Sequence, residues 1–446
     1  MMTSLTIAII AVFVVGYLCI ALESGLKVNK AAIALLMCVG CWTLFSLDPG
    51  SYLAGISPEN LSLHISGLLK EHLGETGETL FFLMGAMTIV EIVDHNGGFN
   101  FVRDTLKTRN KRALLWRIAF MTFFLSAILD NLTTSIVMIM VLRKLVKDRK
   151  DRMIYAALVI VAANSGGAFS PICDVTTIML WIQGMLTTQG VITEIFVPSL
   201  VSMLVPAFIM QFMLQGKLDK SQNIVENTPS ALTKSQRKTI FFLGVGGLVF
   251  VPIFRALTGL PPFMGILLVL GLLWTATEIF HRKADEDDTM AKRVSQLLSR
   301  IDMTTILFFL GILMAVACLE EVGVLTALGK SLESVSGGNH YLVTGIIGVV
   351  SSIVDNVPLV AGCMGMYPVN PVTGADMAVD GIFWQLLAYC AGVGGSLLII
   401  GSAAGVVVMG LEKITFGWYL KHITWIVMIG YLAGIFAYWI ERMIFF

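Results

Sequence analysis

The sequence predicts an all-α polytopic membrane protein built as an inverted repeat, and three observations support this prediction. Hydrophobic residues make up 56% of the 446 residues and charged residues only 13%, against roughly 25% charged in soluble domains. Apolar runs near the ~20 residues needed to cross a bilayer recur along the chain. Similar motifs also return in the same order in its second half. We therefore expect two halves, each with about five transmembrane helices and one re-entrant hairpin, and with discontinuous helices.

Several apolar runs have the length of simple transmembrane helices. They are residues 3–22, 29–47, 78–96, 195–214, 238–256, 262–281, 302–319 and 418–440. The first run lacks a basic region and a small-residue cleavage site, so we interpret it as a transmembrane helix rather than a signal peptide. Two longer stretches, about 153–186 and 381–411, are interrupted by glycine and polar residues, which predicts broken helices.

Two further apolar stretches, about 115–145 and 339–366, carry an Asp-Asn pair at their centres, in "SAILDNLTTS" and "SSIVDNVP". Basic residues flank the first stretch on both sides, so both flanks should be cytoplasmic. A segment that starts and ends on one side cannot cross once. It is predicted to be a hairpin of two half-helices, each of roughly 15 residues and about 22 Å, with Asp130 and Asn131 at the tip.

The second hairpin has the opposite charge signature, because no Lys or Arg lies between Lys330 and Lys413. Its flanks should therefore face outward. The other basic loops alternate correctly if the N-terminus is outside, with Lys330, Arg255 and Arg442 as exceptions.

An internal repeat accounts for the inversion. "LFFLMGAM" (80–87) aligns with "LFFLGILM" (307–314), the two Asp-Asn motifs align, and "ANSGGA" (163–168) aligns more loosely with "AGVGGS" (391–396). An odd number of crossings in each half makes the second half enter upside down, as in secondary transporters. The predicted domains are residues 1–214 and 238–446, joined by a cytoplasmic linker at 215–237.

The hairpin tips supply candidate cation ligands. An ionisable side chain inside a bilayer costs at least ~2.5 kcal/mol, so it is a functional candidate; helix capping is the alternative role for either aspartate. Carboxylate, amide and hydroxyl oxygens are the ligands that small hard cations take. The first tip offers Asp130, Asn131, Thr133 and Thr134, and the second offers Ser351, Asp355 and Asn356.

The segment "AANSGGAFSPICDVTT" (162–177) should unwind at Gly166, Gly167 and Pro171. Its polar residues are added to the predicted site, with a plain interfacial loop as the alternative: Asn164, Ser165, Asp174, Thr176 and Thr177. The matching segment "AGVGGSLLIIGSAAG" (391–405) contains Ser396 and Ser402 but no acid. We therefore expect a lopsided site in which the first half makes more of the ion contacts.

Glu91 lies deepest among the acidic residues at the ends of the apolar spans. It is a candidate for a proton path, and a solvated helix end is the alternative. All seven cysteines lie in apolar stretches, which favours packing over a disulfide framework. A net charge of zero gives no indication of nucleic acid, and the expected partners are small cations and the lipid bilayer.

At these residues the chain resembles the NhaD-type sodium/proton antiporters of the ion transporter superfamily. The motifs "DNLTT", "DNVP", "ANSGGAFSPICDVTT" and "GVGGS" carry the resemblance, which covers nearly the whole chain, most clearly from about residue 78. It implies exchange of Na⁺ or Li⁺ for H⁺ in a bacterial inner membrane, an elevator-type motion, a homodimer and no cofactor. By motif, it also implies transport roles for Asp130, Asn131, Asn164, Asp174, Thr176, Thr177, Ser351, Asp355 and Asn356. The second tip departs from the first, with Pro358 in the place of Thr133.

The predicted mechanism is competition between proton and cation for Asp130 and Asp355. Burial disfavours a charged carboxylate and a bound cation favours it, so the pair resists being both empty and charged. The main alternative keeps the fold and carries an anion, a dicarboxylate or arsenite, although carboxylate tips should repel one. An intramembrane aspartyl protease is the second alternative, and the duplicated motif fits symmetry better than an asymmetric dyad.

Overall fold

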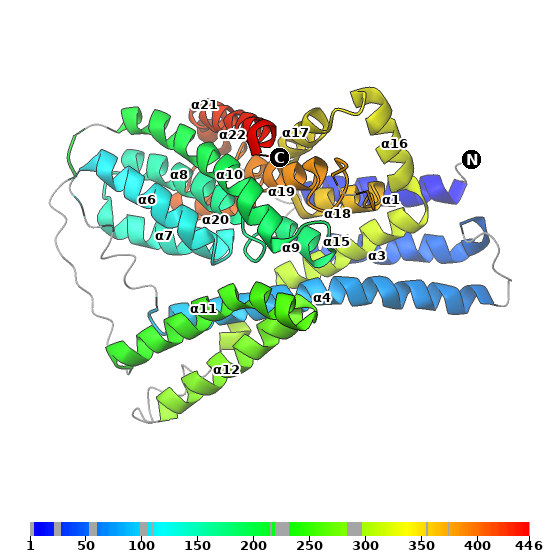
Figure 1. The fold of residues 1–446 in the computed structure, drawn as a ribbon, viewed down its shortest axis with the longest axis horizontal. Coiled ribbons are helices and arrows are strands. Elements are labelled where there is room, and N and C mark those ends of the chain that lie inside the picture. Colours follow the sequence, from blue (N-terminus) through cyan, green and yellow to red (C-terminus); the bar gives the residue numbers. More distant parts are fainter. Residues whose placement is uncertain are drawn as a thin grey trace.

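A computed structural model describes residues 4–21, 28–52, 60–98, 106, 108, 110–214, 216–218, 232–282, 297–353, 356–372 and 374–445. Within these ranges the fold is helical and contains no strand, apart from one isolated β-bridge between Asn110 and Lys217. The prediction of an all-α protein is confirmed (Figure 1). Asp355 and most of the predicted linker lie outside the described residues.

The first half of the described chain runs from α1 to α10. Its helices are α1 (Ser4–Ala21), α3 (Lys30–Leu47), α4 (Leu61–His95), α6 (Lys111–Ser126), α7 (Asn131–Leu145), α8 (Arg149–Ala168), α9 (Val175–Ile182) and α10 (Thr188–Met210). The break between α6 and α7 falls at the Asp-Asn pair, as predicted. The break between α8 and α9 comes later than predicted: Gly166 and Gly167 belong to α8, where the missing Cβ of Gly166 lets the helix pack against the Phe123 backbone of α6, and the non-helical residues are 169–174, which include Pro171.

The second half of the described chain runs from α11 to α22. It comprises α11 (Lys234–Thr258), α12 (Pro262–Arg282), α15 (Met303–Glu321), α16 (Val324–Ser336), α17 (His340–Ser351), α18 (Asn356–Met366), α19 (Ile382–Gly394), α20 (Ala403–Glu412), α21 (Phe416–His422) and α22 (Thr424–Phe445). The inversion of one half relative to the other stays a prediction.

Seven helices in the described ranges are long and apolar enough to cross a membrane: α3, α4, α10, α11, α12, α15 and α22. Helix α4 has 35 residues and begins well before the apolar run at 78–96. Its first turns carry His, Lys and Glu side chains, so a hydropathy pattern finds only the second part of it. Helix α16 was not among the predicted spans, since it is short and mixed in polarity. The predicted run at 418–440 begins inside the short helix α21, and the membrane-length helix of this region, α22, begins only at Thr424.

The helices form two groups. The flanking group consists of α4, α11 and α12, which pack on one another. The bundle consists of α6 to α10, α17 to α20 and α22, on the opposite side of the molecule in Figure 1. In the bundle α10 packs along α22, and the short helices pair across the two halves: α7 lies against α20, and α18 against α9. This pairing of helices from the two halves brings both broken helices to one place.

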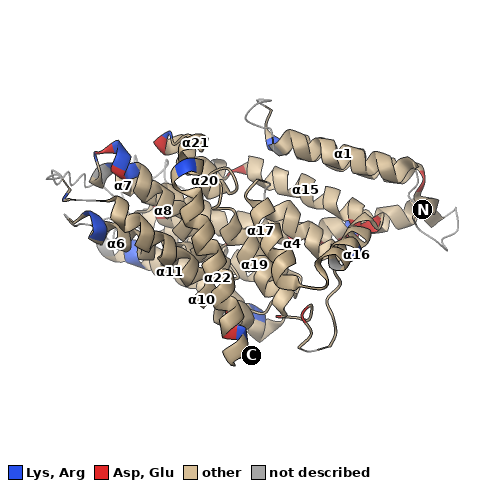
Figure 2. Cartoon of the chain, turned by 90° about the horizontal axis from the view of Figure 1, so that it is seen from above, with Lys and Arg blue, Asp and Glu red and all other residues tan. Residues whose placement is uncertain are grey.

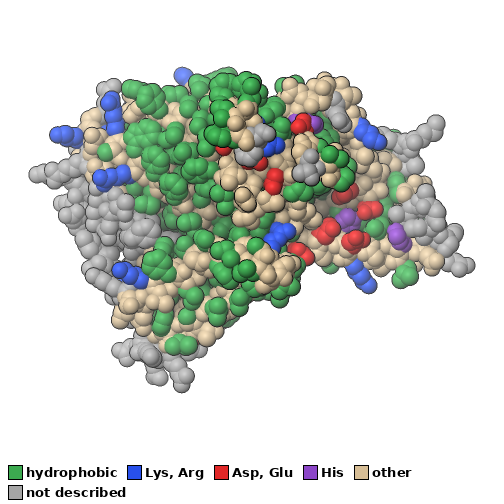
Figure 3. Space-filling model, viewed as in Figure 1, with side chains coloured by type: hydrophobic (Ala, Val, Ile, Leu, Met, Phe, Trp, Pro, Cys, Tyr) green, Lys and Arg blue, Asp and Glu red, His purple; other side chains and the backbone are tan. Residues whose placement is uncertain are grey.

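Charge is unevenly distributed over the molecule. Lys and Arg residues gather at one end of the bundle, around α6, α7 and α20 (Figure 2). Hydrophobic side chains cover much of the face in Figure 3. At the basic end the carboxylate of Glu412 in α20 is fully buried and binds Arg143 Nε of α7 at 2.8 Å and Arg152 Nε of α8 at 2.6 Å. This ion triad joins three helices from both halves.

Candidate ion-binding site

The tip of the first hairpin is formed by residues 127–130, between α6 and α7. Two serines tie it to the neighbouring broken helix: Ser126 Oγ donates to the Ala163 carbonyl at 2.6 Å, and Ser170 Oγ donates to the Ala127 carbonyl at 2.7 Å. The tip is therefore fixed against α8 and against the unwound segment that follows it.

Asp130 is the N-cap of α7. Its Oδ1 accepts from the Thr133 backbone N–H at 2.6 Å and its Oδ2 accepts from Thr133 Oγ1 at 2.7 Å. Capping was the alternative role for this residue, and the structure has it. These two hydrogen bonds leave part of the accepting capacity of the Asp130 oxygens unused, because a carboxylate has about four lone-pair sites. The N-terminal end of α7 also favours negative charge at this position.

Asn164, buried in α8, connects the tip to the second half of the chain. Its Oδ1 accepts from Asn131 Nδ2 at 3.1 Å. Its Nδ2 donates to Ser396 Oγ and to Ser402 Oγ, each at 2.9 Å. The structure thus brings three of the predicted residues, Asn131, Asn164 and Ser396, into one network at the junction of α7, α8, α19 and α20.

The break between α8 and α9 presents a second carboxylate. Asp174 precedes α9, is only 2% exposed, and accepts from Thr176 Oγ1 at 2.6 Å. It lies against two glycines, Gly167 and Gly392: a Cβ on Gly392 would meet Asp174 Oδ2 at 2.7 Å, which is too close. Glycine at 392 therefore allows α19 of the second half to approach this acid. Both Asp130 and Asp174 act electrostatically on Cys173, which places the two carboxylates in one region.

Thr134 contributes an available oxygen. Its hydroxyl is buried in the first turn of α7, and no hydrogen-bond partner for it occurs among the residues that the structure describes. A buried hydroxyl without a hydrogen-bond partner costs free energy. An ion that binds and leaves could serve as the temporary partner of this oxygen. In the described ranges no three His, Cys, Asp or Glu side chains converge as a metal centre, and the oxygens here are mostly amide and hydroxyl.

Other predicted residues serve contacts outside this network. Ser165 pairs with Ser202 of α10 at 2.9 Å, Thr177 Oγ1 donates to the Ala168 carbonyl at 3.2 Å, and Ser351 Oγ donates to the Ala391 carbonyl at 3.0 Å. The last two are local supports of the helix breaks. Glu91 lies on α4 in the flanking group, and the hydrogen bonds that join the tip to α8 and α20 do not include it.

The second tip is described only in part. Asn356 begins α18 and is 9% exposed, while Asp355 lies outside the described residues. That the two tips share one ion therefore stays a prediction.

Ser402 is a residue of the network that the predicted site did not include. It is the N-cap of α20, where its Oγ accepts from the Gly405 N–H at 3.1 Å, and it also accepts from Asn164. A serine followed by small helix-forming residues is a typical helix start. That local signal indicates the cap, and only the fold shows the partner.

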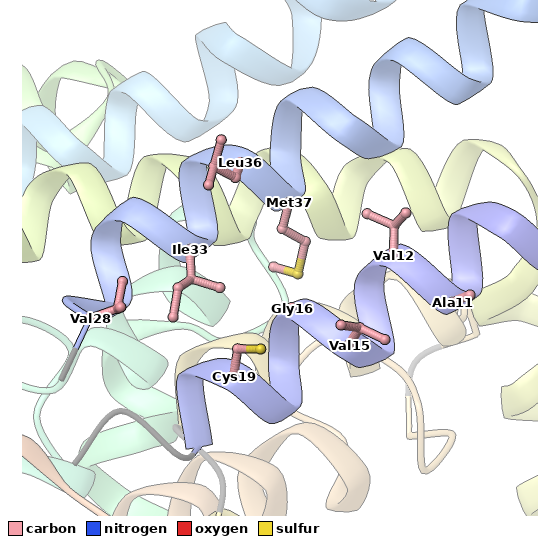
Figure 4. Close-up of a pocket in the computed structure, with 9 residues that line it drawn as sticks. All are labelled: Ala11, Val12, Val15, Gly16, Cys19, Val28, Ile33, Leu36 and Met37. Carbon is pink, nitrogen blue, oxygen red and sulfur yellow. The ribbon is translucent and has the colours of Figure 1, made fainter. Parts of the chain in front are cut away.

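Two cavities lie elsewhere. A groove of about 540 Å³ between α1 and α3 is lined by apolar side chains such as Val12, Val15 and Met37 (Figure 4), so it offers no ligands for a cation. A smaller cavity of about 80 Å³ between α4, α15, α9 and α18 is lined by His72, Glu75 and Glu320, among others. His72 Nε2 pairs there with Glu321 at 2.9 Å. Neither cavity contains a residue of the hairpin-tip network.

The helical fold, the several apolar helices and the oxygen-rich junction of broken helices define a polytopic membrane transporter. A family model described as citrate transporter, CitMHS, matches residues 17–387, and the chain belongs to this family. Its relatives include sodium/proton antiporter 1 of Arabidopsis thaliana, which is 45% identical over 97% of this chain and 72% of the relative.

Bacterial relatives carry the name predicted from the motifs. The Na(+)/H(+) antiporter NhaD of Alkalimonas amylolytica is 30% identical over 96% of this chain and 88% of its own length. The NhaD of Vibrio cholerae is also 30% identical, over 96% of this chain and 90% of the relative. The resemblance to NhaD-type antiporters is therefore confirmed, and the relatives are transporters rather than enzymes.

A solved structure supports the fold. The crystal structure of the Alcanivorax borkumensis YdaH transporter, which is described as having an unusual topology, superposes with a TM-score of 0.60. It covers 93% of this chain and 98% of the YdaH chain at 11% identity. At this identity the likeness concerns the fold alone.

Proposed function

We propose that the protein exchanges Na⁺ or Li⁺ for H⁺ across a membrane, as the names of its antiporter relatives suggest. One structural observation carries the proposal. The Asp130 carboxylate lies at a helix break beside an amide and hydroxyl network drawn from both halves of the chain. The ligand set is Asp130, Asn131, Thr133, Thr134, Asn164, Asp174, Thr176, Ser396 and Asn356, with Asp355 completing it from the second tip. Thr177 and Ser351 support the breaks, Ser165 bonds to Ser202 of α10, and Glu91 keeps its proposed place on a proton path.

The proposed mechanism is competition for the two carboxylates of the first half, with Asp355 as their counterpart. Each oxygen of Asp130 accepts one hydrogen bond from Thr133, which leaves lone pairs for either a proton or a cation. The Asn131 amide nitrogen donates to Asn164, and the carbonyl oxygen of the same amide group is the atom that would face an ion. Water-poor surroundings disfavour an empty charged site, and the bundle reorients only when a proton or a cation occupies it.

The test is Na⁺-dependent proton movement in proteoliposomes of the purified protein. With an acidic interior set beforehand, external Na⁺ or Li⁺ should dissipate the pH gradient, and K⁺ serves as the comparison ion. We expect Asp130→Asn and Asp174→Asn to reduce the initial rate by at least about 100-fold, by analogy with enzymes, in which removing one preorganised electrostatic partner of the reacting group costs ~10²–10³ in rate.

Asp148→Asn is the matched control, because Asp148 is an exposed N-cap of α8 and asparagine caps as well as aspartate does. It should retain the parent rate. If Asp130→Asn and Asp355→Asn both exchange Na⁺ for H⁺ at the parent rate, the carboxylate assignment is wrong.

Anion transport is the second candidate, because the family model is described as citrate transporter. The side chains that bond to the tip network are acidic, amide or hydroxyl groups, and a citrate anion would meet two carboxylates without a basic partner among them. Uptake of labelled citrate by the same proteoliposomes separates the two candidates. Citrate uptake without Na⁺-dependent proton movement would replace antiport as the function.

The cellular setting and assembly remain part of this proposal. Bacterial relatives are consistent with the predicted bacterial inner membrane. The Arabidopsis relatives, at 45% and 42% identity, are equally consistent with a membrane of a plant cell. The homodimer and the outside position of the N-terminus stay predictions.

A further inference from the structure

Arg255 was an exception to the predicted charge distribution, since it is a basic residue near the outward end of α11. In the structure its Nη1 donates to the Trp181 carbonyl at 2.7 Å and its Nη2 donates to the Ile182 carbonyl at 3.4 Å. Its guanidinium carbon lies 4.7 Å from the centroid of the Trp181 ring. Arg255 therefore binds the last turn of α9 through its backbone and through an aromatic face.

The end of α9 is a suitable place for such a cation. The last carbonyls of any helix lack intrahelical partners, and the C-terminal end of a helix favours positive charge. Helix α9 has only eight residues, about 12 Å of length. Asp174 and Thr176 lie at its first turn, so a displacement of its last turn is transmitted directly to the candidate site.

This contact joins the two helix groups. Helix α11 packs mainly on α12 and α4 in the flanking group, whereas α9 packs mainly on α18 and α19 in the bundle. Helix α9 also makes a smaller contact with α4, where the Trp181 and Phe82 ring centroids are 6.3 Å apart. The two hydrogen bonds of Arg255 to α9 therefore form only when the flanking group and the bundle hold this relative position. Glu78 of α4 also acts electrostatically on Arg255, so the flanking group itself offers the guanidinium another negative partner.

We propose that Arg255 is a positioning residue that latches α9 to the flanking helices in this conformation. It releases α9 when the bundle moves, and the Glu78 carboxylate then becomes its nearest partner. The link between this movement and ion exchange rests on the proposed function. The latch itself is a statement about two helix groups and is independent of the ion carried.

The first experiment measures the distance between the groups in the full-length protein. Spin labels attached to a non-natural amino acid at Leu272 of α12 and Phe436 of α22, both exposed, leave the native cysteines unlabelled. In the parent, one spin-label distance should dominate the distribution. We expect Arg255→Gln to lower the ratio of this main population to all other distances by at least about fivefold, which corresponds to the loss of ~1 kcal/mol of interaction between the two helix groups. Arg255→Lys keeps the charge but loses the planar fork, so it should lie in between.

Lys238→Gln is the matched control, because it removes one positive charge from the exposed opposite end of the same helix. Its distance distribution should match that of the parent. A distribution for Arg255→Gln that superposes on the parent would mean that Arg255 is a static helix cap, and the latch would be rejected. If Arg255→Gln does not fold, the Arg255→Lys distribution decides in the same way.

The second experiment crosslinks the latch. Cysteines introduced at Arg255 and Gln183, joined by a short bifunctional thiol reagent, should show Na⁺-dependent proton movement that is lower by at least about tenfold than in the same double variant before crosslinking, and the loss should be reversible. The reagent should leave the rate of each single variant at its own untreated value. The control pair Phe254→Cys and Gly265→Cys lies within the flanking group, where these positions are in contact, and its crosslinking should leave transport unchanged. Transport at the parent rate through the crosslinked 255–183 pair would reject the latch.

The two proposals can fail separately. Absence of Na⁺-dependent proton movement in the uncrosslinked parent would reject the proposed function. The spin-label result would still decide whether Arg255 holds the two groups together.

Discussion

Asn164 is the residue on which the candidate site depends most at the level of single side chains. An amide carries two donors and an acceptor on one planar group, and Asn164 uses both kinds: it donates to Ser396 and Ser402 and accepts from Asn131. Aspartate could not donate these bonds, and alanine would leave buried hydroxyls with one partner fewer. The residue therefore sets the spacing between the first hairpin and the start of α20.

We expect Asn164→Ala to raise the Na⁺ concentration for half-maximal exchange by at least about fivefold, since an unpaired buried polar group costs ~1–3 kcal/mol. The measurement is a Na⁺ titration of the pH-gradient assay. Ser165→Ala is the control, because Ser165 is the next residue and bonds to Ser202 of α10 instead. Equal half-saturation in Asn164→Ala and Ser165→Ala would exclude this role.

Helices α7 and α20 illustrate how elements are held in register. Both begin at the candidate site, at the caps Asp130 and Ser402, and both end at the buried Glu412 triad. Arg143 also donates to the Leu411 carbonyl. With both ends fixed, the second arm of the first hairpin and the second part of the broken helix should move as one body.

We expect Glu412→Gln to lower the unfolding free energy by ~3 kcal/mol, because it leaves Arg152, which is largely buried, without its anionic partner. Thermal unfolding in detergent, followed by circular dichroism, measures this. Glu71→Gln removes an equal charge from an exposed position of α4 and should leave the unfolding temperature unchanged. A Glu412→Gln protein as stable as Glu71→Gln would show that the triad contributes little.

At the scale of the whole molecule, the basic residues decide the predicted orientation. Arg143 and Arg149 of the first hairpin flank meet the Leu411 and Lys413 carbonyls, and Lys217 pairs with Asn110 at the start of α6. Segments that the sequence assigned independently to the cytoplasmic side therefore lie at one end. This agreement favours the positive-inside assignment.

The orientation can be tested with single reporter cysteines. Lys147→Cys, at the exposed connection between α7 and α8, should react with a membrane-impermeant thiol reagent only in everted vesicles. Leu260→Cys, between α11 and α12 and 43% exposed, should react in intact cells. The reverse labelling pattern would overturn the predicted orientation.

The sequence by itself determined the class of protein and the positions of the helix breaks. Both are local properties: apolar length decides a span, and glycine, proline and capping residues decide where a helix ends. Asp130 and Asp174 could be singled out for the same reason, as charged residues next to such breaks. The flanking charges suggested the hairpin, and the motif order suggested the repeat.

The tertiary structure decided the partners. Asn164 meets Ser396 and Ser402 across 232 and 238 residues, and Arg143 meets Glu412 across 269. In their own segments Ser402 shows only the signal of a helix cap and Arg255 only an unexpected charge, and Glu412 shows no distinguishing signal, so no local pattern could assign their partners. Their positions follow from the packing of short helices across the two halves, because the distance between residues remote in sequence is set only when the whole chain folds.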